Sequence, residues 1–376
     1  MKKILFLTGT RADFGKIKSL ISILDNHQEF EVFVFVTGMH LQKEYGYTLI
    51  EIERSNFNNV HAFENHTHET TMDLTLAKTI EGFSSYCKTV EPDLIVIHGD
   101  RVETLAGAIV GSLNNILVAH IEGGELSGTV DELIRHSVTK LSHIHFVSNH
   151  EAAKRLTQMG EMKSSIFTIG SPDIDIMFSD DLPSLEIVKN YYQIDFDQYA
   201  IVMFHPVTTE AKQMKQYTED FVNSLLVTDE NFIVIYPNND LGSKYIIDAY
   251  QKIKDNPQFR IFPSLRFEYF LALLKNAKFI IGNSSAGIRE APYYGIPIIN
   301  IGTRQQNRTL NADIINVDYQ KENIIIALHS VINHKISPVN SDFGKGKSAK
   351  LFLNSLLSSK IWEINHQKKF KNIDFD

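Results

Sequence analysis

The sequence predicts an α/β protein of two doubly wound domains, each with a parallel sheet covered by helices. Short runs of β-branched, aliphatic or aromatic residues recur along the chain, and the segments between them are long enough to form helices. Strands that are apolar on both faces are typical of parallel sheets with helices on both sides. The length of 376 residues exceeds one ordinary core and favours two domains.

The first series of these elements predicts an N-terminal domain over residues 1–180. The expected strands are 4–7, 32–36, 94–97, 117–121, 143–147 and 166–169, and the expected helices are 16–24, 72–87, 104–113, 131–141 and 151–159. An alternation of strand and helix is the pattern of a doubly wound sheet.

A second series predicts a C-terminal domain over residues 181–355. The strands of this series follow a charged connector at 180–197, and the connector contains a short helix that begins after Leu182-Pro183-Ser184. The expected strands are 200–204, 232–236, 260–262, 279–281, 298–301 and 314–317. The segment at 349–362 has a helical composition, and it and the tail at 356–376 are expected to pack back on the first domain. Sheets of this kind bind ligands beyond the carboxyl ends of their strands, so a central cleft between the domains is the expected site.

Composition excludes several classes of function. The net charge of −8 argues against nonspecific nucleic-acid binding, because nothing overall attracts a phosphate polymer. Cys87 is the only cysteine, which excludes an intrachain disulfide and suits a reducing cytoplasm. The apolar run after Lys3 is too short for a secretory signal, and no run approaches the roughly 20 residues needed to span a bilayer. We expect a soluble cytoplasmic protein that binds neither nucleic acid nor membrane.

Two turns have the composition of anion-binding sites. The first strand leads through Thr8-Gly9-Thr10 into a helix start that carries Arg11. Helix N-termini direct N–H groups and a positive dipole end at anions, and a guanidinium binds phosphate bidentately. The strand at 279–281 leads through Gly282-Asn283-Ser284-Ser285 into a helix with Glu290, which could bind two ribose hydroxyls. A plain βα turn and a serine-capped helix are the structural alternatives.

Three carboxylates predict acid–base chemistry in the first domain. Asp100 follows a strand, Glu122 ends the next strand beside two glycines, and Asp131 lies in the first turn of the following helix. Carboxylates at the carboxyl edge of a sheet are candidates for proton transfer.

Each of these acids also has a structural interpretation. Asp100 could cap the next helix or pair with Arg101. Asp131 could pair with Arg135 in a helix that begins with a capping box at Thr129.

The second domain adds polar groups after its own strands. His205 follows the strand at 200–204 and precedes a proline, which favours exposure of its imidazole, although a buried and satisfied histidine is the alternative. Arg304 adds a guanidinium after the strand at 298–301. The motifs of zinc proteases, P-loops and EF-hands are absent, and His66 and His68 are interpreted as loop residues, so no metal site is expected.

Taken together, these motifs resemble those of the hydrolysing UDP-N-acetylglucosamine 2-epimerases of bacterial sialic acid synthesis, a family that includes the epimerase half of a human bifunctional enzyme. The resemblance runs nearly end to end through Gly9-Thr10-Arg11-Ala12-Asp13-Phe14-Gly15, Val36-Thr37-Gly38-Met39-His40, His98-Gly99-Asp100-Arg101, His120-Ile121-Glu122-Gly123-Gly124-Glu125, Asp131 with Ile134-Arg135-His136-Ser137, Phe204-His205-Pro206, Gly282-Asn283-Ser284-Ser285, Arg289-Glu290 and Gly302-Thr303-Arg304-Gln305.

The resemblance implies a GT-B fold of two Rossmann-like domains that close on UDP. It implies elimination of UDP from UDP-N-acetylglucosamine to a glycal, followed by addition of water with inversion at C2, without a cofactor or metal. It also implies a homo-oligomer, a dimer or a tetramer.

Residue roles follow from the same resemblance. The resemblance implies that the catalytic residues are Asp100, Glu122, Asp131 and His205. It implies that UDP is bound by Arg11, Arg101, His205, Asn238, Leu265, Ser284, Ser285, Glu290 and Arg304. Gly15 stands where the human-type pattern has serine.

Four alternatives remain open from the sequence. They are an epimerase for a UDP-diacetamido-trideoxyhexose, a non-hydrolysing epimerase that keeps UDP attached, a GT-B glycosyltransferase, and a UDP-sugar sensor without catalysis. The three acids favour elimination chemistry over the last two.

Overall fold

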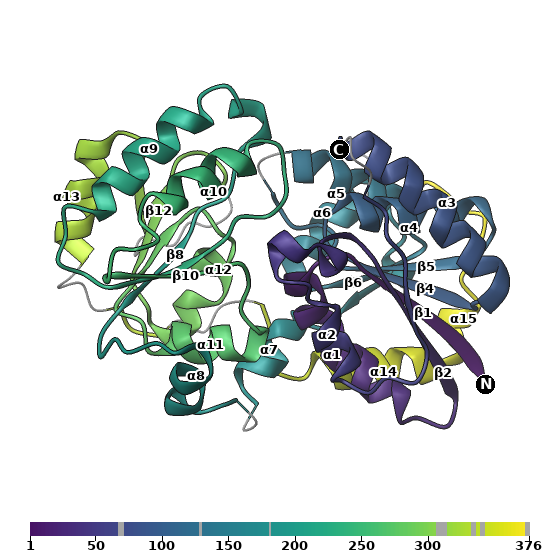
Figure 1. Ribbon diagram of the computed structural model, residues 1–376. Helices are drawn as coiled ribbons and strands as arrows, with labels where there is room; N and C mark the ends of the chain where they lie inside the picture. The colour runs from purple at the N-terminus through teal and green to yellow at the C-terminus, as the bar shows by residue number, and fades with distance from the viewer. Residues whose placement is uncertain are drawn as a thin grey trace. The chain divides into compact units, whose positions relative to one another are not determined.

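In the computed structural model, the chain forms two parallel β-sheets, one in each of two units (Figure 1). The structure describes residues 1–66, 71–127, 130–179, 182–305, 314–331, 336–338 and 343–372. Unit 1 comprises 1–125, 131–179 and the described residues from 343 onward. Unit 2 comprises the described residues of 182–338 with the short segment 126–130.

The sheet of unit 1 has the strand order β3-β2-β1-β4-β5-β6-β7, with every neighbouring pair parallel. Its strands are β1 (Lys2–Thr8), β2 (Phe30–Val36), β3 (Val60–Ala62), β4 (Leu94–His98), β5 (Leu117–Ile121), β6 (Ile144–Val147) and β7 (Ile166–Thr168). Its helices are α1 (Arg11–Asp25), α2 (Leu49–Glu53), α3 (Met72–Val90), α4 (Val102–Leu113), α5 (Val130–Leu141), α6 (His150–Gln158), α7 (Pro172–Met177), α14 (Ser348–Leu357) and α15 (Ser359–Trp362), with short 3₁₀ turns at Gly38–Leu41, Lys43–Tyr45 and Lys163–Ser165.

Helices cover both faces of this sheet because its central strands are apolar on both sides. Every residue of β4 and β5 is buried. On one face of β1, Phe6 packs with α1 and with Phe352 of α14, and on the other face Leu7 lies near Gly107 of α4. The doubly wound architecture predicted for the first domain is therefore confirmed.

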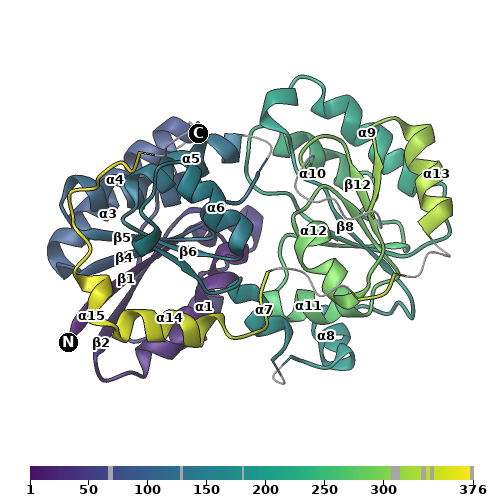
Figure 2. The same cartoon turned by 180° about the vertical axis from the view of Figure 1, so that it is seen from behind.

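The C-terminal segment packs on unit 1 from α14 onward, as expected for the helical segment at 349–362. Figures 1 and 2 show α14 alongside α1, with α15 continuing from its end. Phe352 and Leu356 are fully buried in the unit 1 core, and the carboxylate of Asp175 accepts hydrogen bonds from the first two N–H groups of α14. This buried apolar stripe and its cap place α14 in unit 1, whereas the expected second domain extended to residue 355.

The end of the chain is also fixed to unit 1. Lys368 Nζ donates to the carbonyl oxygens of Thr139 and Ser142 at the C-terminal end of α5, and it pairs with buried Glu161 at 2.6 Å. Burial opposes ionisation of Glu161, but His145 and the nearby lysines outweigh it and lower the pKa of Glu161 to about 2. An ionic cluster therefore joins the tail to α5.

The sheet of unit 2 has the strand order β10-β9-β8-β11-β12-β13 and is also parallel throughout. Its strands are β8 (Ala200–Met203), β9 (Phe232–Ile235), β10 (Phe259–Phe262), β11 (Ile280–Gly282), β12 (Ile298–Ile301) and β13 (Ile314–Val317). Its helices are α8 (Leu185–Tyr192), α9 (Met214–Leu225), α10 (Ser243–Gln251), α11 (Phe267–Lys275), α12 (Ala286–Arg289) and α13 (Lys321–Val331), with 3₁₀ turns at Thr208–Glu210 and Ala291–Tyr294.

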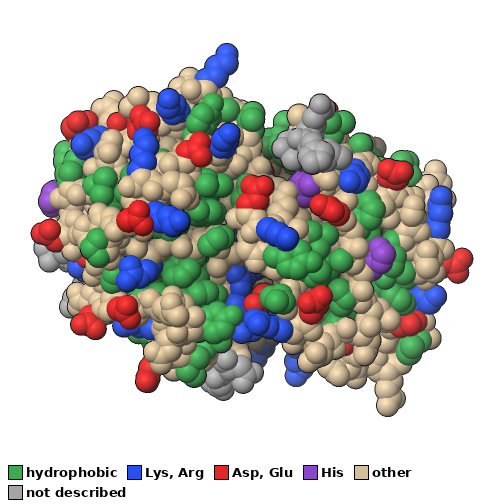
Figure 3. Space-filling model, in the orientation of Figure 1, with side chains coloured by type: hydrophobic (Ala, Val, Ile, Leu, Met, Phe, Trp, Pro, Cys, Tyr) green, Lys and Arg blue, Asp and Glu red, His purple; other side chains and the backbone are tan. Residues whose placement is uncertain are grey.

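All twelve expected strands coincide with observed ones to within two residues at either end, and the short β3 at the edge of the first sheet was not expected. The connector contains the expected short helix α8, whose N-cap is Ser184. Within the described ranges, no helix is long and apolar enough to cross a membrane. On the face shown in Figure 3, acidic and basic side chains are interspersed over each unit.

Candidate active site

The turn after β1 folds as expected, but it satisfies part of its own anion-binding capacity. Thr10 is the N-cap of α1, and its hydroxyl accepts a hydrogen bond from Asp13 N at 3.1 Å. Asp13 Oδ2 accepts a hydrogen bond from Gly9 N at 3.0 Å. The carboxylate of Asp13 therefore takes the place of an external anion at this amide, and Arg11, the first residue of α1, remains the group expected to bind phosphate.

A buried chain of three side chains connects this turn to the ends of β4 and β5. His98 Nδ1 lies 2.9 Å from Asp13 Oδ1, and His98 Nε2 lies 3.1 Å from Glu122 Oε2. Burial alone would lower the pKa of His98, but the two carboxylates outweigh it and raise this pKa to about 9. His98 is therefore an imidazolium at neutral pH and donates to both carboxylates.

Glu122 is held from several directions. It follows β5 with a left-handed φ of +62°, which a non-glycine residue adopts at a cost, and its side chain is 2% exposed. The hydroxyl of Ser171 donates to Glu122 Oε1, and Lys16 Nζ lies 3.8 Å from Oε2. Lys16 also pairs with buried Asp173 at 3.0 Å. The strained backbone and these partners fix the direction of the carboxylate.

Arg135 connects the other two predicted acids to this group. Its guanidinium donates to Asp100 Oδ2 and to the backbone carbonyl of Glu122. Asp131 lies one turn earlier on α5 and is also buried. The structure therefore ties the Asp100 and Glu122 loops to the helix that carries Asp131.

The structure tests one of the structural interpretations given for these acids. Asp100 is not the N-cap residue of α4, because Arg101 occupies that position without a side-chain capping bond. The cap expected at Thr129 lies outside the described residues. His136, which the sequence pattern would place in the packing of α5, lies on the surface of that helix and pairs with Glu132 at 3.1 Å.

In unit 2 the predicted residues gather around Asn283, the buried residue that follows β11. Its side-chain amide exchanges two hydrogen bonds with the backbone of His205, at 2.6 and 2.9 Å. The backbone carbonyl oxygen of Asn283 accepts hydrogen bonds from the side chains of Arg304, at 3.1 Å, and Gln305, at 2.9 Å. Asn283 thus holds the loops after β8, β11 and β12 together.

The imidazole of His205 has a defined tautomer. Its Nδ1 accepts a hydrogen bond from the backbone N–H of Asn238 at 3.1 Å. An accepting Nδ1 carries no proton, so the single proton of this neutral ring is on Nε2, which acts as a donor. The side chain of Asn238 donates to Asp240.

The turn after β11 forms a shorter helix than the sequence suggested. Ser285 occupies the N-cap position of the four-residue α12 without a side-chain cap, and Ser284 Oγ accepts from Ala286 N at 3.3 Å. The dipole of so short a helix is small, so an anion here depends on hydroxyl and N–H donors. Glu290 follows α12 as its C-cap residue and is 3% exposed, and Leu265 is buried between β10 and α11 in the sequence.

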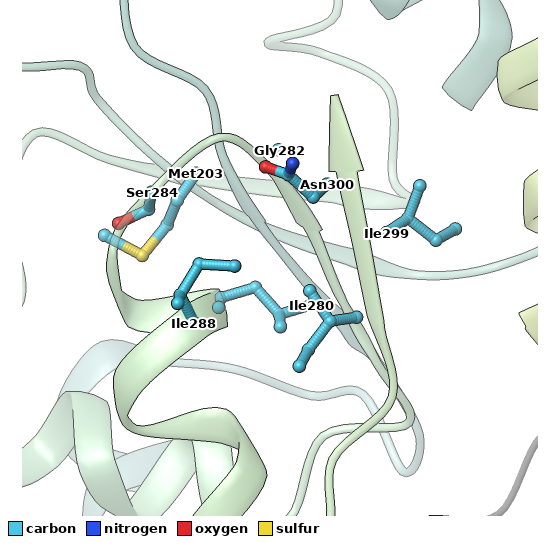
Figure 4. A pocket seen from close by; sticks show the side chains of 9 residues that line it. Met203, Ile280, Gly282, Ser284, Ile288, Ile299 and Asn300 are labelled. Atoms are coloured by element: carbon cyan, nitrogen blue, oxygen red, sulfur yellow. The ribbon is translucent and has the colours of Figure 1, made fainter. Parts of the chain in front are cut away.

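Figure 4 shows a small, mainly apolar hollow next to this turn. Ser284, Gly282 and Asn300 lie at its polar side, and Ile288 and Ile280 belong to its apolar side. The described residues contain no group of three or more histidine, cysteine or acidic side chains placed to hold a metal ion.

Sequence reasoning did not assign roles to several residues that the structure brings to these sites. They are Asp13, Lys16, His98, Ser171, Asp173 and Asn283. His98 and Asp13 lie in motifs that the sequence analysis names. His98 could have been recognised as a site residue, because it is a polar residue at the end of an apolar strand. Ser171 and Asp173 stand outside those motifs, and their role depends on the fold of α7 beside α1.

The two Rossmann-like domains and the polar groups at the ends of their strands define an α/β protein of the GT-B class. A family model described as UDP-N-acetylglucosamine 2-epimerase matches residues 22–357. The chain therefore belongs to the UDP-N-acetylglucosamine 2-epimerase family.

Relatives agree over the full length. The chain is 48% identical over 377 residues, covering 100% of both chains, to a UDP-N-acetylglucosamine 2-epimerase of Neisseria meningitidis serogroup B. It is 33% identical to polysialic acid biosynthesis protein P7 of Escherichia coli, covering 100% of this chain and 96% of the relative. It is 32% identical to the hydrolysing UDP-N,N'-diacetylbacillosamine 2-epimerase of Legionella pneumophila, covering 93% and 94%.

A solved structure confirms the fold. The UDP-GlcNAc 2-epimerase of Methanocaldococcus jannaschii, in complex with UDP-GlcNAc and UDP, matches with a TM-score of 0.81. Its sequence is 24% identical, and the match covers 95% of this chain and 99% of that one.

Proposed function

We propose that the chain is a hydrolysing epimerase that converts UDP-N-acetylglucosamine and water into N-acetylmannosamine and UDP. The observation that carries this proposal is the connected group of acids in unit 1. Glu122 is bonded to the His98–Asp13 pair, and Arg135 joins Asp100 to the Glu122 backbone. A site with several positioned acids suits a reaction that both removes and returns protons.

The reaction has two balanced steps. In the first, a base removes the proton from C2 while the C1–O bond to UDP breaks, so the electron pair of the C2–H bond forms the C1=C2 double bond of a glycal and UDP leaves. In the second, a base takes a proton from water as its oxygen bonds to C1, and an acid delivers a proton to C2 on the opposite face. The product is free N-acetylmannosamine with inverted C2.

The acids have distinct roles in this proposal. Glu122 and Asp131 exchange protons with C2 and water, and Asp100 stabilises the positive charge that develops at C1 as UDP departs. The His98 imidazolium keeps Glu122 in its carboxylate form at the start of the cycle. His205 uses its Nε2–H as a donor to the departing diphosphate, which gains negative charge.

UDP recognition is assigned to the residues around Asn283 and to two arginines of unit 1. Arg11, Arg101 and Arg304 supply positive charge for the diphosphate, and Ser284 and Ser285 supply donors. Glu290 accepts the ribose hydroxyls, Leu265 supplies a backbone contact to uracil, and Asn238 contributes its side-chain carbonyl oxygen, which is buried and has no partner among the described residues.

The wider setting follows from the same proposal. N-acetylmannosamine would supply sialic acid synthesis, which the resemblance to a polysialic acid biosynthesis protein supports. We propose a cytoplasmic homo-oligomer, a dimer or a tetramer, that uses no cofactor and binds neither nucleic acid nor membrane.

One experiment tests the reaction directly. The full chain is incubated with UDP-N-acetylglucosamine in deuterated water, and the products are followed by proton NMR. We expect free UDP and N-acetylmannosamine that carries deuterium at C2. Accumulation of UDP-N-acetylmannosamine would indicate the non-hydrolysing reaction, and an intact C2–H bond in the released sugar would exclude elimination.

Variants test the assignment of the acids. Asp100→Asn, Glu122→Gln and Asp131→Asn are each expected to retain UDP binding and to lower kcat by at least ~100-fold, the lower range for acid–base groups. Glu132→Gln, on the surface of the same helix α5, is the matched control and should keep full activity. Full activity in all three variants would contradict the assignment.

The alternative with specific support is hydrolysis of a UDP-diacetamido-trideoxyhexose, because a relative with that activity is 32% identical. The two substrates differ only on the hexose, so residues that contact the sugar decide between them.

A further inference from the structure

A buried acid, Glu103, lies in the first turn of α4. Its side chain is 2% exposed, and its Oε2 atom is buried without a hydrogen-bond partner among the residues that the structure describes. A buried carboxylate oxygen with no donor is costly, typically about 1–3 kcal/mol or more. The position therefore calls for an occupant that donates hydrogen bonds.

Two glycine backbones enclose this carboxylate. A Cβ atom at Gly9 would lie 2.9 Å from the carboxyl carbon of Glu103, and one at Gly38 would lie 2.7 Å from Oε1. Gly38 also has a φ of +63°, which disfavours any other residue. The two glycines therefore leave room for the Glu103 carboxylate, with which a side chain at either position would collide.

His66 provides a second polar group in the same place. Both of its ring nitrogens are buried and lack hydrogen-bond partners within the described part of the chain. Its position is fixed, because Lys78 donates to its carbonyl oxygen and the preceding residue, Asn65, accepts from Gly38 N at 3.1 Å. Burial lowers the pKa of His66, and the charge of Glu103 is the largest opposing influence. A neutral imidazole beside Glu103 can both donate and accept.

The Glu103–His66 pair lies next to the connected acids of unit 1. These are Asp100, Glu122 and Asp13 with their partners His98 and Arg135, and they are called the acid–base group below. Gly9, which packs against Glu103, donates its N–H to Asp13, and Asp13 is bonded to His98 and through it to Glu122. Glu103 also follows Asp100 by three residues, in the first turn of the helix that comes after β4. The pair therefore lies beside the residues proposed to act on C1 and C2, within the same unit.

We propose that Glu103 and His66 bind hydroxyl groups of the hexose remote from C1 and C2 and thereby select a hydroxylated sugar. The inference rests on the proposed function. N-acetylglucosamine carries hydroxyls at C4 and C6, whereas the diacetamido-trideoxyhexose carries an acetamido group at C4 and a methyl group at C6. The methyl group offers no donor to a carboxylate, and the acetamido group is bulkier than the hydroxyl that it replaces.

The competing explanation for Glu103 is helix stabilisation. A carboxylate in the first turn of α4 interacts favourably with the helix dipole. That explanation accounts for the acid, but not for its burial without a donor or for the neighbouring His66 with two unused ring nitrogens. The two explanations predict different effects on substrate choice.

The test compares two substrates in wild type, Glu103→Gln and His66→Phe, with release of UDP as the readout. Wild type is expected to prefer UDP-N-acetylglucosamine over UDP-diacetamido-trideoxyhexose. Each variant should lower kcat/KM for UDP-N-acetylglucosamine by about 10- to 100-fold, the usual effect of losing a hydrogen bond to a charged group, with little change for the second substrate. Binding of UDP alone should be unchanged, and Glu81→Gln, exposed on α3, is the control.

A complementary measurement needs no variant. Wild type is assayed with UDP-4-deoxy- and UDP-6-deoxy-N-acetylglucosamine, and at least one should lose about 100-fold or more in kcat/KM, because a site built to bind a hydroxyl rejects an analogue without it. Equal losses for both substrates in Glu103→Gln, or full activity with both deoxy analogues, would overturn this inference alone. Wild type that releases no UDP from UDP-N-acetylglucosamine would instead overturn the proposed function.

Discussion

Replacement of His98 by glutamine tests whether an imidazolium holds the acids of unit 1 together. Glutamine retains hydrogen-bonding capacity but cannot carry charge. The pKa of His98 rises from 6.5 to about 9 in the folded chain, because the carboxylates of Asp13 and Glu122 outweigh the effect of burial. The folded state therefore binds the proton more tightly than the unfolded state does.

The sign and size of the effect follow from linkage. The stabilisation is fully present below pH 6.5, declines as the pH rises toward 9, and is absent above that value. A shift of this size corresponds to about 3 kcal/mol of unfolding free energy. His98→Gln should therefore remove about 3 kcal/mol at pH 6 and flatten the dependence of stability on pH between 6.5 and 9.

The assay uses urea unfolding followed by tryptophan fluorescence at several pH values. The single tryptophan, Trp362, packs against the unit 1 core, so its signal reports on the unit that contains His98. His150→Gln, at an exposed histidine on α6, is the control and should leave the profile unchanged. The reasoning is refuted if His98→Gln shows the same decline in stability between pH 6.5 and 9 as wild type.

Three further substitutions have outcomes that the structure determines. Arg135→Met should lower the unfolding free energy by about 3 kcal/mol, because it leaves the partly buried Asp100 without its guanidinium, and should lower kcat at unchanged UDP affinity, as steady-state kinetics and calorimetry would show. Glu161→Gln should reduce the loss of stability on acidification. The lowered pKa of Glu161 contributes stability above pH 4.5 that disappears as the pH falls to about 2, and urea unfolding between these pH values measures the unfolding free energy. Gly282→Ala should prevent unit 2 from folding, because the new Cβ would lie 2.0 Å from the Met203 carbonyl oxygen at a φ of +139°; limited proteolysis that leaves unit 2 intact would contradict this.

The strands and long helices were predictable because a buried parallel strand requires an uninterrupted apolar run. The runs at 94–97 and 117–121 are buried at every residue, and their neighbours in the sheet follow the order expected for a doubly wound fold. The packing of the helical segment at 349–362 on the first domain was predicted, but the end of the second domain was expected at residue 355, inside α14, because the pattern of an amphipathic helix does not show which core it covers. Its place is decided by Phe352 and by the cap from Asp175, which lies 173 residues away from Ser348 in the sequence.

Some residues of the candidate site were also predictable from the sequence, and others were not. Asp100, Glu122 and His205 were recognisable because polar residues after apolar strands gather at one edge of a sheet. Their partners were not, since His98 and Asp13 are 85 residues apart and only the parallel pairing of β1 with β4 brings them together. Glu103 was overlooked because a carboxylate in the first turn of a helix has a sufficient structural explanation in the sequence alone.

The cations of unit 1 explain how a chain of net charge −8 can act on a substrate that is itself an anion. Lys16, His98 and Arg135 each contact a carboxylate of the acid–base group, so its negative charge is largely offset before the substrate binds. At the same time, a carboxylate that is already hydrogen-bonded to an imidazolium is a weaker base than a free one. In the proposed reaction, the arrangement favours proton transfer only when a positive centre develops beside the acids as UDP leaves C1. Loss of the C2 proton should therefore be coupled to departure of UDP, and exchange of C2–H with solvent should not occur without UDP release.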